Sequence, residues 1–364
     1  MIVNRKKFIP RLIAWEITRS CQLNCVHCRA AARFGPYENE LTTQEIFRTM
    51  ENIAGFASPI IILTGGDPLL REDVFEISKY GNGLGFRMVM SPCGKAMNEE
   101  TVGKMVDSGI KRISISIDGA TAESHDTFRQ VKGAFEDAMK ALDVAVRAGL
   151  EFQINTTVTK SNVGELEAIL KLASKKGAVG FNPFLLVPTG RGRELRDQEI
   201  SPREYEKVLN WIYEQRKTTP IQFKPTCAPH YYRIFRQREK QEGRKISADT
   251  HGLDAMTKGC MGGQTFAFIS HRGKIQICGF LETECGDLRQ ANYDFKKIWD
   301  RSDVFQQMRA WDDYHGRCGY CEYRTVCGGC RARAYATTGD YLAEEPYCIY
   351  QPKAKSSHTI AETT

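Results

Sequence analysis

The stretch CQLNCVHC, residues 21–28, places three cysteines within eight residues. A closed structural zinc site takes four ligands, and a conventional iron–sulfur cluster takes four thiolates. The next cysteine along the chain is Cys93, far outside this stretch. The triplet therefore indicates a metal site that keeps one coordination position open. The alternative is a zinc site completed by a ligand from elsewhere in the chain.

The residues around the triplet predict a barrel of alternating strands and helices. RLIAWEIT (11–18) is typical of a strand that leads into the triplet. Further strands are expected within 59–70, 110–120, 150–160 and 178–192, with helices within 42–56, 98–109, 133–149 and 163–177. Such alternation makes a parallel sheet wrapped by helices. We expect an α/β fold, a partial (β/α)6 TIM-like barrel open at one side with a cysteine-rich C-terminal extension.

The change of pattern along the chain predicts four segments. The barrel core takes residues 1–205, a helical bridging region takes 206–255, the cysteine-rich extension takes 256–350, and a flexible tail takes 351–364. The extension consists of short strands and turns with frequent cysteine. We therefore expect it to bury little apolar area and to depend on bound metal for its stability.

Composition limits the compartment and the partners. The chain has 364 residues and 13 cysteines, and it shows neither a signal peptide nor an apolar run of membrane-spanning length. We expect a cytoplasmic protein, where disulfides are disfavoured and grouped cysteines hold metals or act in redox chemistry. The formal charge of +7 includes no basic cluster with interleaved aromatics, which argues against nucleic acid. It is compatible with a small anionic substrate, although charge alone favours a solvated surface of mixed sign.

Three features, in order, resemble the radical S-adenosylmethionine (SAM) superfamily. They are CxxxCxxC after the first strand, TGGDP (64–68) after the second, and SISIDG (114–119) at the end of a later strand. The resemblance implies a 4Fe–4S cluster on Cys21, Cys25 and Cys28, whose free iron is chelated by the amino and carboxylate groups of SAM. An electron from the reduced cluster splits SAM and yields a 5′-deoxyadenosyl radical. Contacts to the cofactor are implied for Gly65, Gly66, Asp67, Ser116, Asp118, Arg129, Asn155 and Thr157.

Each of these contact residues, taken alone, could equally be structural. The turn is usually Gly-Gly-Glu-Pro in the superfamily, so Asp67 keeps the charge with a shorter reach. Arg129 is expected to fork onto the methionine carboxylate. Asn155 and Thr157 alternate along one strand and therefore share a face. Cys93, in MSPCG, is interpreted as a buried thiol that no base partners.

The later cysteines resemble the SPASM extension of radical SAM enzymes. Cys260 is followed by twelve residues, Gly273, four residues and Cys278; then come CxxCx5CxxC (318–330) and Cys348. One residue fewer than usual precedes Cys330. The resemblance implies two auxiliary 4Fe–4S clusters: the first on Cys260, Cys278, Cys285 and Cys330, and the second on Cys318, Cys321, Cys327 and Cys348. Cys227 competes with Cys285 as a ligand, and a pair of structural zinc sites is the alternative.

Four longer segments are similar to the heme synthases of the siroheme-dependent alternative pathway, a likeness that covers nearly the whole chain. They are RLIAWEITRSCQLNCVHCRAAA (11–32), FLLVPTGRGREL (184–195), PTCAPHYYRI (225–234) and CGGCRARAYATTGDYLAEEPYC (327–348). The resemblance implies radical oxidation of two propionates of iron-coproporphyrin III to vinyls, with loss of carbon dioxide and an electron, giving heme b. Relatives that act on didecarboxysiroheme or in heme d1 formation share such segments and remain alternatives.

SPASM peptide modification is a further alternative, with a non-catalytic iron–sulfur protein least favoured. Only about twenty residues precede Cys21, which we expect to be too few for the peptide-binding domain that peptide modifiers often carry. Gly279 stands where sulfatase-maturing relatives place an aspartate base. A reaction that needs no base at this position is therefore favoured.

The substrate implied by the resemblance needs cations for its carboxylates and a ligand for its iron. Arg191 and Arg193 are candidates for the propionates. His230 and Cys227 are candidates for iron ligation, and Tyr231 for flanking the ring, although each of these residues could instead be structural. A low-potential donor such as flavodoxin or ferredoxin, an electron acceptor and an anaerobic host are also implied.

Overall fold

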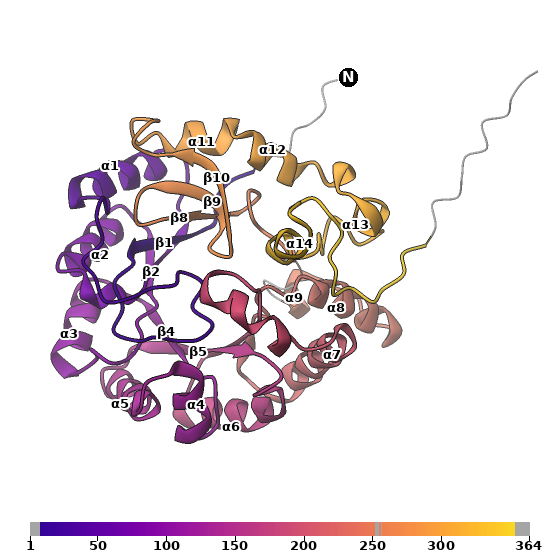
Figure 1. Cartoon of the computed structure of the whole chain (residues 1–364), viewed down its shortest axis with the longest axis horizontal. Helices are drawn as coiled ribbons and strands as arrows, with labels where there is room; N and C mark the ends of the chain where they lie inside the picture. Colours follow the sequence, from indigo (N-terminus) through magenta and orange to yellow (C-terminus); the bar gives the residue numbers. More distant parts are fainter. Residues whose placement is uncertain (1–7, 252–254, 256, 354–364) are drawn as a thin grey trace, which may run out of the picture.

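A single mixed sheet of ten strands organises the molecule. The computed structural model describes residues 8–251, 255 and 257–353. The strand order is β10-β9-β8-β1-β2-β3-β4-β5-β6-β7. Figure 1 labels seven of these strands, with β8, β9 and β10 on the side of β1 away from β4 and β5. The strands are β1 (Leu12–Thr18), β2 (Ile60–Gly65), β3 (Arg87–Met90), β4 (Arg112–Ser116), β5 (Glu151–Val158), β6 (Gly180–Leu185), β7 (Gln222–Phe223), β8 (Phe266–Ile269), β9 (Lys274–Cys278) and β10 (Leu281–Asp287).

Helices surround the parallel part of this sheet. Strands β1 to β7 pair in parallel with their neighbours, which confirms the predicted barrel-like α/β fold. The α-helices are α1 (Thr43–Ala54), α2 (Val74–Gly83), α3 (Glu99–Asp107), α4 (Ala122–Arg129), α5 (Ala134–Arg147), α6 (Leu166–Lys176), α7 (Pro202–Thr218), α8 (His230–Gln241), α9 (Ala248–His251), α11 (Phe295–Arg301), α12 (Asp303–Arg309), α13 (Gly316–Tyr320) and α14 (Arg331–Thr338). Short 3-10 segments are η1 (Pro68–Leu70), η2 (Val163–Glu165), η3 (Gly190–Gln198) and η4 (Trp311–Asp313).

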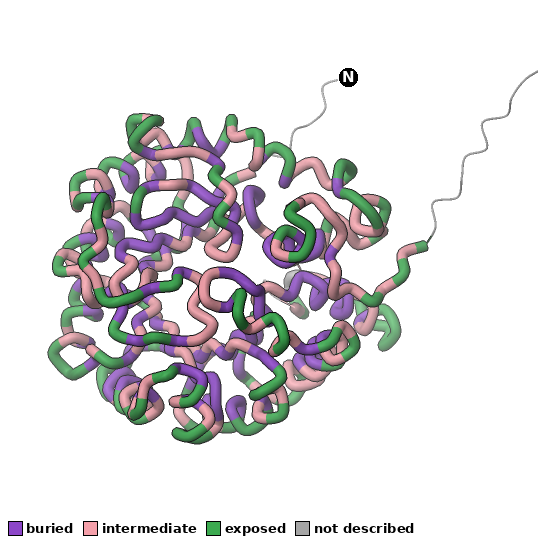
Figure 2. The backbone as a smooth tube through the Cα atoms, viewed as in Figure 1, coloured by how far each residue is buried: buried purple, intermediate pink, exposed green. Residues whose placement is uncertain are grey.

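Burial varies from residue to residue along the strands, and Figure 2 colours the backbone by it. In β5, Phe152, Ile154, Thr156 and Val158 are buried, and the residues between them are only half-buried. Alternate residues of a strand point to opposite faces. A closed TIM barrel fills its interior with large branched side chains. Here the alternate polar positions stay accessible, so this face can receive ligands.

The C-terminal strands extend the same sheet, which the sequence did not predict. Strand β8 pairs in parallel with β1, and β9 and β10 form an antiparallel hairpin beside it. The expectation that this region buries little apolar area was wrong. Ile269, Ile275, Trp299 and Phe305 are all buried in the main core. Pairing with β1 gives the extension a shared hydrophobic core, so its stability does not rest on metal alone.

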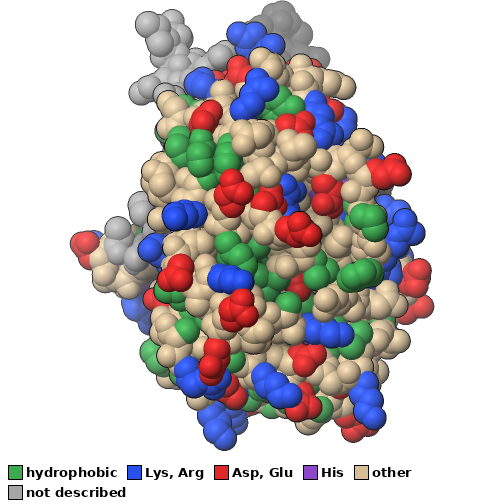
Figure 3. All heavy atoms as spheres, turned by 90° about the vertical axis from the view of Figure 1, so that its left-hand side faces the viewer, with side chains coloured by type: hydrophobic (Ala, Val, Ile, Leu, Met, Phe, Trp, Pro, Cys, Tyr) green, Lys and Arg blue, Asp and Glu red, His purple; other side chains and the backbone are tan. Residues whose placement is uncertain are grey.

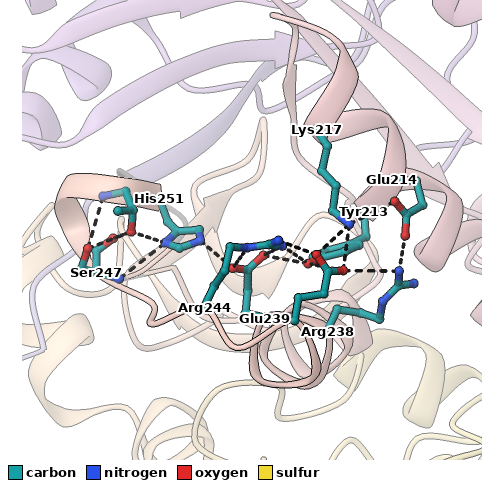
Figure 4. A network of polar contacts seen from close by, with 10 residues as sticks. Tyr213, Glu214, Lys217, Arg238, Glu239, Arg244, Ser247 and His251 are labelled. Atoms are coloured by element: carbon teal, nitrogen blue, oxygen red, sulfur yellow. Dashed lines mark hydrogen bonds and ion pairs between the residues drawn. The ribbon is translucent and has the colours of Figure 1, made fainter.

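A polar network ties together the helices that follow the barrel (Figure 4). Tyr213 of α7 donates a hydrogen bond to Glu239 of α8 at 2.8 Å, and Arg244 and His251 contact the same carboxylate. The hydrogen bonds from Arg244 lower the pKa of Glu239 to about 2. The network fixes α7, α8 and α9 relative to one another. The predicted segment boundaries remain predictions, and most of the predicted tail lies outside the described residues.

The outer surface is of mixed charge. Lysine, arginine, aspartate and glutamate side chains are interspersed over the face that carries α1, α2 and α3 (Figure 3). No helix among the described residues is long and apolar enough to cross a membrane.

Candidate active site

The three cysteines of the opening motif lie together after β1. Cys21 and Cys25 are buried in one small cluster of apolar residues, and Cys28 packs against that cluster. Each sulfur accepts one N–H at 3.4 Å: Cys21 from Leu23, Cys28 from Ala32, and Cys25 from the guanidinium of Arg129. Sulfur acceptors arranged in this way suit thiolates that bind metal, because donated hydrogen bonds stabilise the charged form.

Glu16 of β1 anchors both ends of this loop. Its buried carboxylate pairs with Arg19 at 2.9 Å before the triplet and with Arg29 at 3.0 Å after it. His271, which follows β8, contacts the same carboxylate at 2.8 Å. Although burial opposes ionisation, these partners lower the pKa of Glu16 to about 2. The carboxylate therefore stays ionised and couples the loop to the C-terminal strands.

The Gly-Gly-Asp turn after β2 packs against the backbone that leads into Cys21. The N–H of Gly66 donates to the Thr18 carbonyl at 3.0 Å, and a Cβ at Gly66 would lie 2.2 Å from the carbonyl oxygen of Ser20. A Cβ at Gly65 would lie 2.1 Å from the Thr18 carbonyl oxygen. Both glycines are therefore required by close backbone contact, whatever they offer to a cofactor.

Asp67 is a buried residue with protein partners of its own. Its carboxylate accepts from the Leu69 N–H at 3.2 Å, which caps η1, and from the Cys93 thiol at 2.9 Å. Burial raises its pKa. The interpretation of Cys93 as a thiol without a basic partner was wrong. The loop that carries Cys93 follows β3, and it lies beside the Gly-Gly-Asp turn because β3 pairs with β2.

An ion pair connects the barrel strands to the triplet. Arg129, at the end of α4, contacts the Asp118 carboxylate and donates to Cys25. The other carboxylate oxygen of Asp118 accepts the Thr157 N–H at 2.7 Å, and the Asp118 N–H donates to His125 at 3.1 Å. Burial next to Arg129 lowers the pKa of His125 to about 4, so its ring is a neutral acceptor.

Polar side chains of β4, β5 and β6 lie next to this ion pair and form a polar row with it. Ser116 pairs in register with Asn155, and Asn182 of β6 donates to the Asn155 amide oxygen at 3.2 Å. The structure thus places the residues expected to contact the cofactor along one edge of β2, β4 and β5, next to the triplet. Their contacts to the cofactor remain predictions.

The first auxiliary group consists of Cys227, Cys260, Cys278 and Cys330. Cys227 hydrogen-bonds to Cys330, and Cys260 and Cys278 interact electrostatically with Cys330. Cys227 has a φ of 56°, a left-handed conformation that is uncommon outside glycine. Tyr205 and Arg333 hold its carbonyl at 2.7 and 3.0 Å. These two contacts hold the backbone of Cys227 in its left-handed conformation.

Cys285 is a different kind of cysteine, which corrects its assignment to this group. Cys278 pairs with Leu281 at the turn of the hairpin, whereas Cys285 lies further along β10, between the residues that pair with Gln276 and Ile275. Its thiol faces the Thr283 carbonyl at 3.8 Å, with Ser302 and Arg309 nearby. The sequence alone could not decide between Cys227 and Cys285, because the choice depends on contacts between segments that are far apart in the chain.

The four cysteines that the family resemblance assigns to the second auxiliary group lie close together, and their binding of a cluster remains a prediction. Cys318, Cys321, Cys327 and Cys348 surround one cavity. Cys321 and Cys327 accept the N–H of the residue two positions later at 3.4 and 3.5 Å, and Cys348 does likewise. Arg331 donates to Cys318 at 3.6 Å. Among the described residues no group of His, Cys, Asp or Glu is arranged to hold a single metal ion.

Arg29 lies between the triplet and the first auxiliary group. It follows Cys28 directly, stacks over the Phe268 ring at 4.6 Å, and is close enough to Cys278 to influence its thiol. A Cβ at Gly279 would lie 3.0 Å from the Arg29 Nε atom. The guanidinium of Arg29 therefore lies directly against Gly279.

The residues predicted to bind substrate lie in three different environments. Arg191 donates to the backbone carbonyls of Cys25 and Ala32 at 2.9 and 2.6 Å, so it clamps the triplet loop. Arg193 is exposed. His230 and Tyr231 are buried at the start of α8, where Tyr231 packs on other aromatic rings. These positions do not favour porphyrin contacts by His230 or Tyr231.

Several site residues escaped sequence reasoning. Glu16 and Arg29 lie on either side of the triplet, and the buried Arg331 and Arg333 lie one and three residues after Cys330. Their position next to cysteine motifs was the signal in the sequence that could have identified them. A charged residue that is buried beside such a motif needs a partner there.

Comparisons with known proteins agree on one superfamily. The model of the radical SAM superfamily matches residues 15–173. An AdoMet-dependent heme synthase of Nitratidesulfovibrio vulgaris is 53% identical over 94% of this chain and 93% of its own length. One of Methanosarcina barkeri is 51% identical over 95% and 98%. The crystal structure of Streptococcus suis SuiB bound to S-adenosylmethionine matches with a TM-score of 0.72 at 14% identity, over 94% of this chain and 78% of that one, a likeness in fold.

Proposed function

Because the chain belongs to the family of AdoMet-dependent heme synthases within the radical SAM superfamily, we propose that it converts iron-coproporphyrin III into heme b. Each of two propionates loses one hydrogen atom, one electron and carbon dioxide, and becomes a vinyl group. The observation that carries the proposal is the likeness to heme synthases over the whole length, combined with a complete set of thiols in the fold. Family membership implies a 4Fe–4S cluster and SAM.

We assign three cluster sites to the described thiols. Cys21, Cys25 and Cys28 fit the SAM-binding cluster, because each sulfur accepts an N–H and three thiols leave one iron free. With SAM bound, this site supplies the 5′-deoxyadenosyl radical that abstracts hydrogen from the substrate. The two auxiliary groups described above provide four thiols each and fit two further clusters that accept or relay an electron.

The chain's own residues suit an oxidation that releases carbon dioxide. No base is needed when the substrate radical loses carbon dioxide and an electron, and Gly279 offers none. Arg29 supplies a positive charge in front of Cys278, and its pairing with Glu16 fixes its direction. An oriented guanidinium can hold a propionate carboxylate in a bidentate manner. We therefore assign Arg29 as a carboxylate anchor, with the half-buried polar row of β4 and β5 facing the cofactor.

The test is an anaerobic incubation of reconstituted protein with SAM, dithionite and iron-coproporphyrin III, followed by mass spectrometry of the porphyrin. Two stepwise losses of carbon dioxide and hydrogen, with matching 5′-deoxyadenosine, are expected. If 5′-deoxyadenosine forms while the porphyrin mass stays fixed, the substrate assignment is wrong, and didecarboxysiroheme and then peptides are tested in its place. In the cell, a low-potential flavodoxin or ferredoxin would replace dithionite, and a separate acceptor would take the released electrons.

A further inference from the structure

The ring of His230 is buried with no hydrogen-bond partner. Its side chain opens α8 and is fully buried, yet neither Nδ1 nor Nε2 has a partner among the described residues. The ring of Tyr205 packs edge-on against it, with centroids 4.9 Å apart. Leaving a buried donor unpaired costs about 1–3 kcal/mol. Buried polar groups in native structures are usually hydrogen-bonded, so an unpaired buried imidazole indicates a partner that the protein alone does not supply.

His230 lines the cavity that Cys318, Cys321, Cys327 and Cys348 surround. Arg233 lies three residues later on the same face of α8 and lines the same cavity. Two of its guanidinium nitrogens are engaged, by Gln237 at 2.7 Å and by Glu206 at 2.6 Å, while its buried Nε has no partner among the described residues. The first turn of α8 thus presents two unpartnered donors to one thiol-lined cavity.

The protonation of the imidazole follows from its neighbours. Arg233, Arg331 and Arg333 all lie close enough to oppose a further positive charge on a ring that is already buried. A neutral imidazole carries one N–H donor and one acceptor nitrogen. Because the four thiols already provide the usual ligand set, His230 is not needed as a fifth ligand.

We propose that His230 donates a hydrogen bond to a sulfur atom of the second auxiliary cluster and thereby raises its reduction potential, with the Arg233 Nε as a second donor. Reduction adds negative charge to the cluster, so a donated N–H stabilises the reduced form more than the oxidised form. The inference rests on the proposed second cluster and is independent of the porphyrin substrate. Through this hydrogen bond, His230 favours reduction of the second auxiliary cluster.

The experiment is an EPR-monitored redox titration of the anaerobically reconstituted holoenzyme. The signal of the second auxiliary cluster is identified as the one that Cys348→Ala removes. In His230→Leu we expect this cluster's midpoint potential to fall, with the ratio of reduced to oxidised cluster about tenfold lower at the wild-type midpoint, which is about 59 mV for one electron. His230→Gln keeps an N–H and should recover part of the shift. His251→Gln, on α9, should not change the potential.

A second readout does not depend on the stability of the leucine variant. With 15N-histidine label, pulsed EPR of the reduced cluster should show a coupling to one imidazole nitrogen that His230→Gln abolishes and His251→Gln retains. An unchanged potential in His230→Leu with full iron content, or a 15N coupling that persists in His230→Gln, would overturn the inference. If the potential shifts as expected but no vinyl forms in the porphyrin assay, the proposed substrate fails and the role of His230 stands.

Discussion

Replacing Glu16 with glutamine tests whether one buried carboxylate fixes the geometry of the cysteine loop. Glu16 is fully buried and pairs with Arg19, Arg29 and His271. Its pKa is lowered from 4.5 to about 2. This difference corresponds to about 3 kcal/mol of stability at neutral pH. The isosteric amide keeps the volume but leaves three cationic partners without their counter-charge, so we expect Glu16→Gln to unfold about 3 kcal/mol more easily at pH 7.

The pH dependence has a definite sign. A carboxylate whose folded pKa is lowered stabilises the protein fully above its unfolded pKa, and the contribution disappears as pH falls through the folded value. The deficit of Glu16→Gln relative to wild type should therefore be constant from pH 8 to about 5.5 and shrink to roughly 1.4 kcal/mol at pH 3.

Anaerobic urea unfolding at several pH values measures this deficit, with exposed Glu282→Gln as the matched control expected within about 0.5 kcal/mol of wild type. A deficit under about 1 kcal/mol at pH 7, or one that grows as the pH falls, would refute the reasoning.

The remaining predictions concern the cysteines and Arg129, which is expected to contact SAM. Cys227→Ser should lose about four iron atoms per chain after anaerobic reconstitution, whereas Cys285→Ser should keep the wild-type iron and sulfide content; the reverse result would restore Cys285 as the ligand. Arg129→Gln should raise the Kd for SAM at least about tenfold in equilibrium binding, and unchanged binding would show that its contacts to Asp118 and Cys25 are only structural. Cys93→Ala removes the donor to Asp67, so its free energy of unfolding should fall by about 1 kcal/mol with iron content retained, and loss of cluster iron would contradict this.

Wrong expectations in the C-terminal region share one physical cause. A motif in a single loop brings its members together over short stretches of backbone, as it does for Cys318, Cys321 and Cys327. Cys227 meets Cys330 where α7, α14 and the end of β6 pack together, and Tyr205 of α7 and Arg333 of α14 both donate hydrogen bonds to its carbonyl. Spacing along the chain contains no information on such contacts. Cys285 would complete a set of four cysteines equally well, but it lies on β10 near Ser302 and Arg309.

The sequence by itself determined the alternation of strands and helices, the open cysteine triplet and the Gly-Gly-Asp turn, because hydrophobic period and local spacing are short-range properties. Tertiary structure alone decided that β8 pairs with β1, that Arg29 faces Gly279, and that His230 is buried against the second group of thiols. These relations join residues far apart in the chain. They depend on how the elements pack and on which buried charges and donors find partners there.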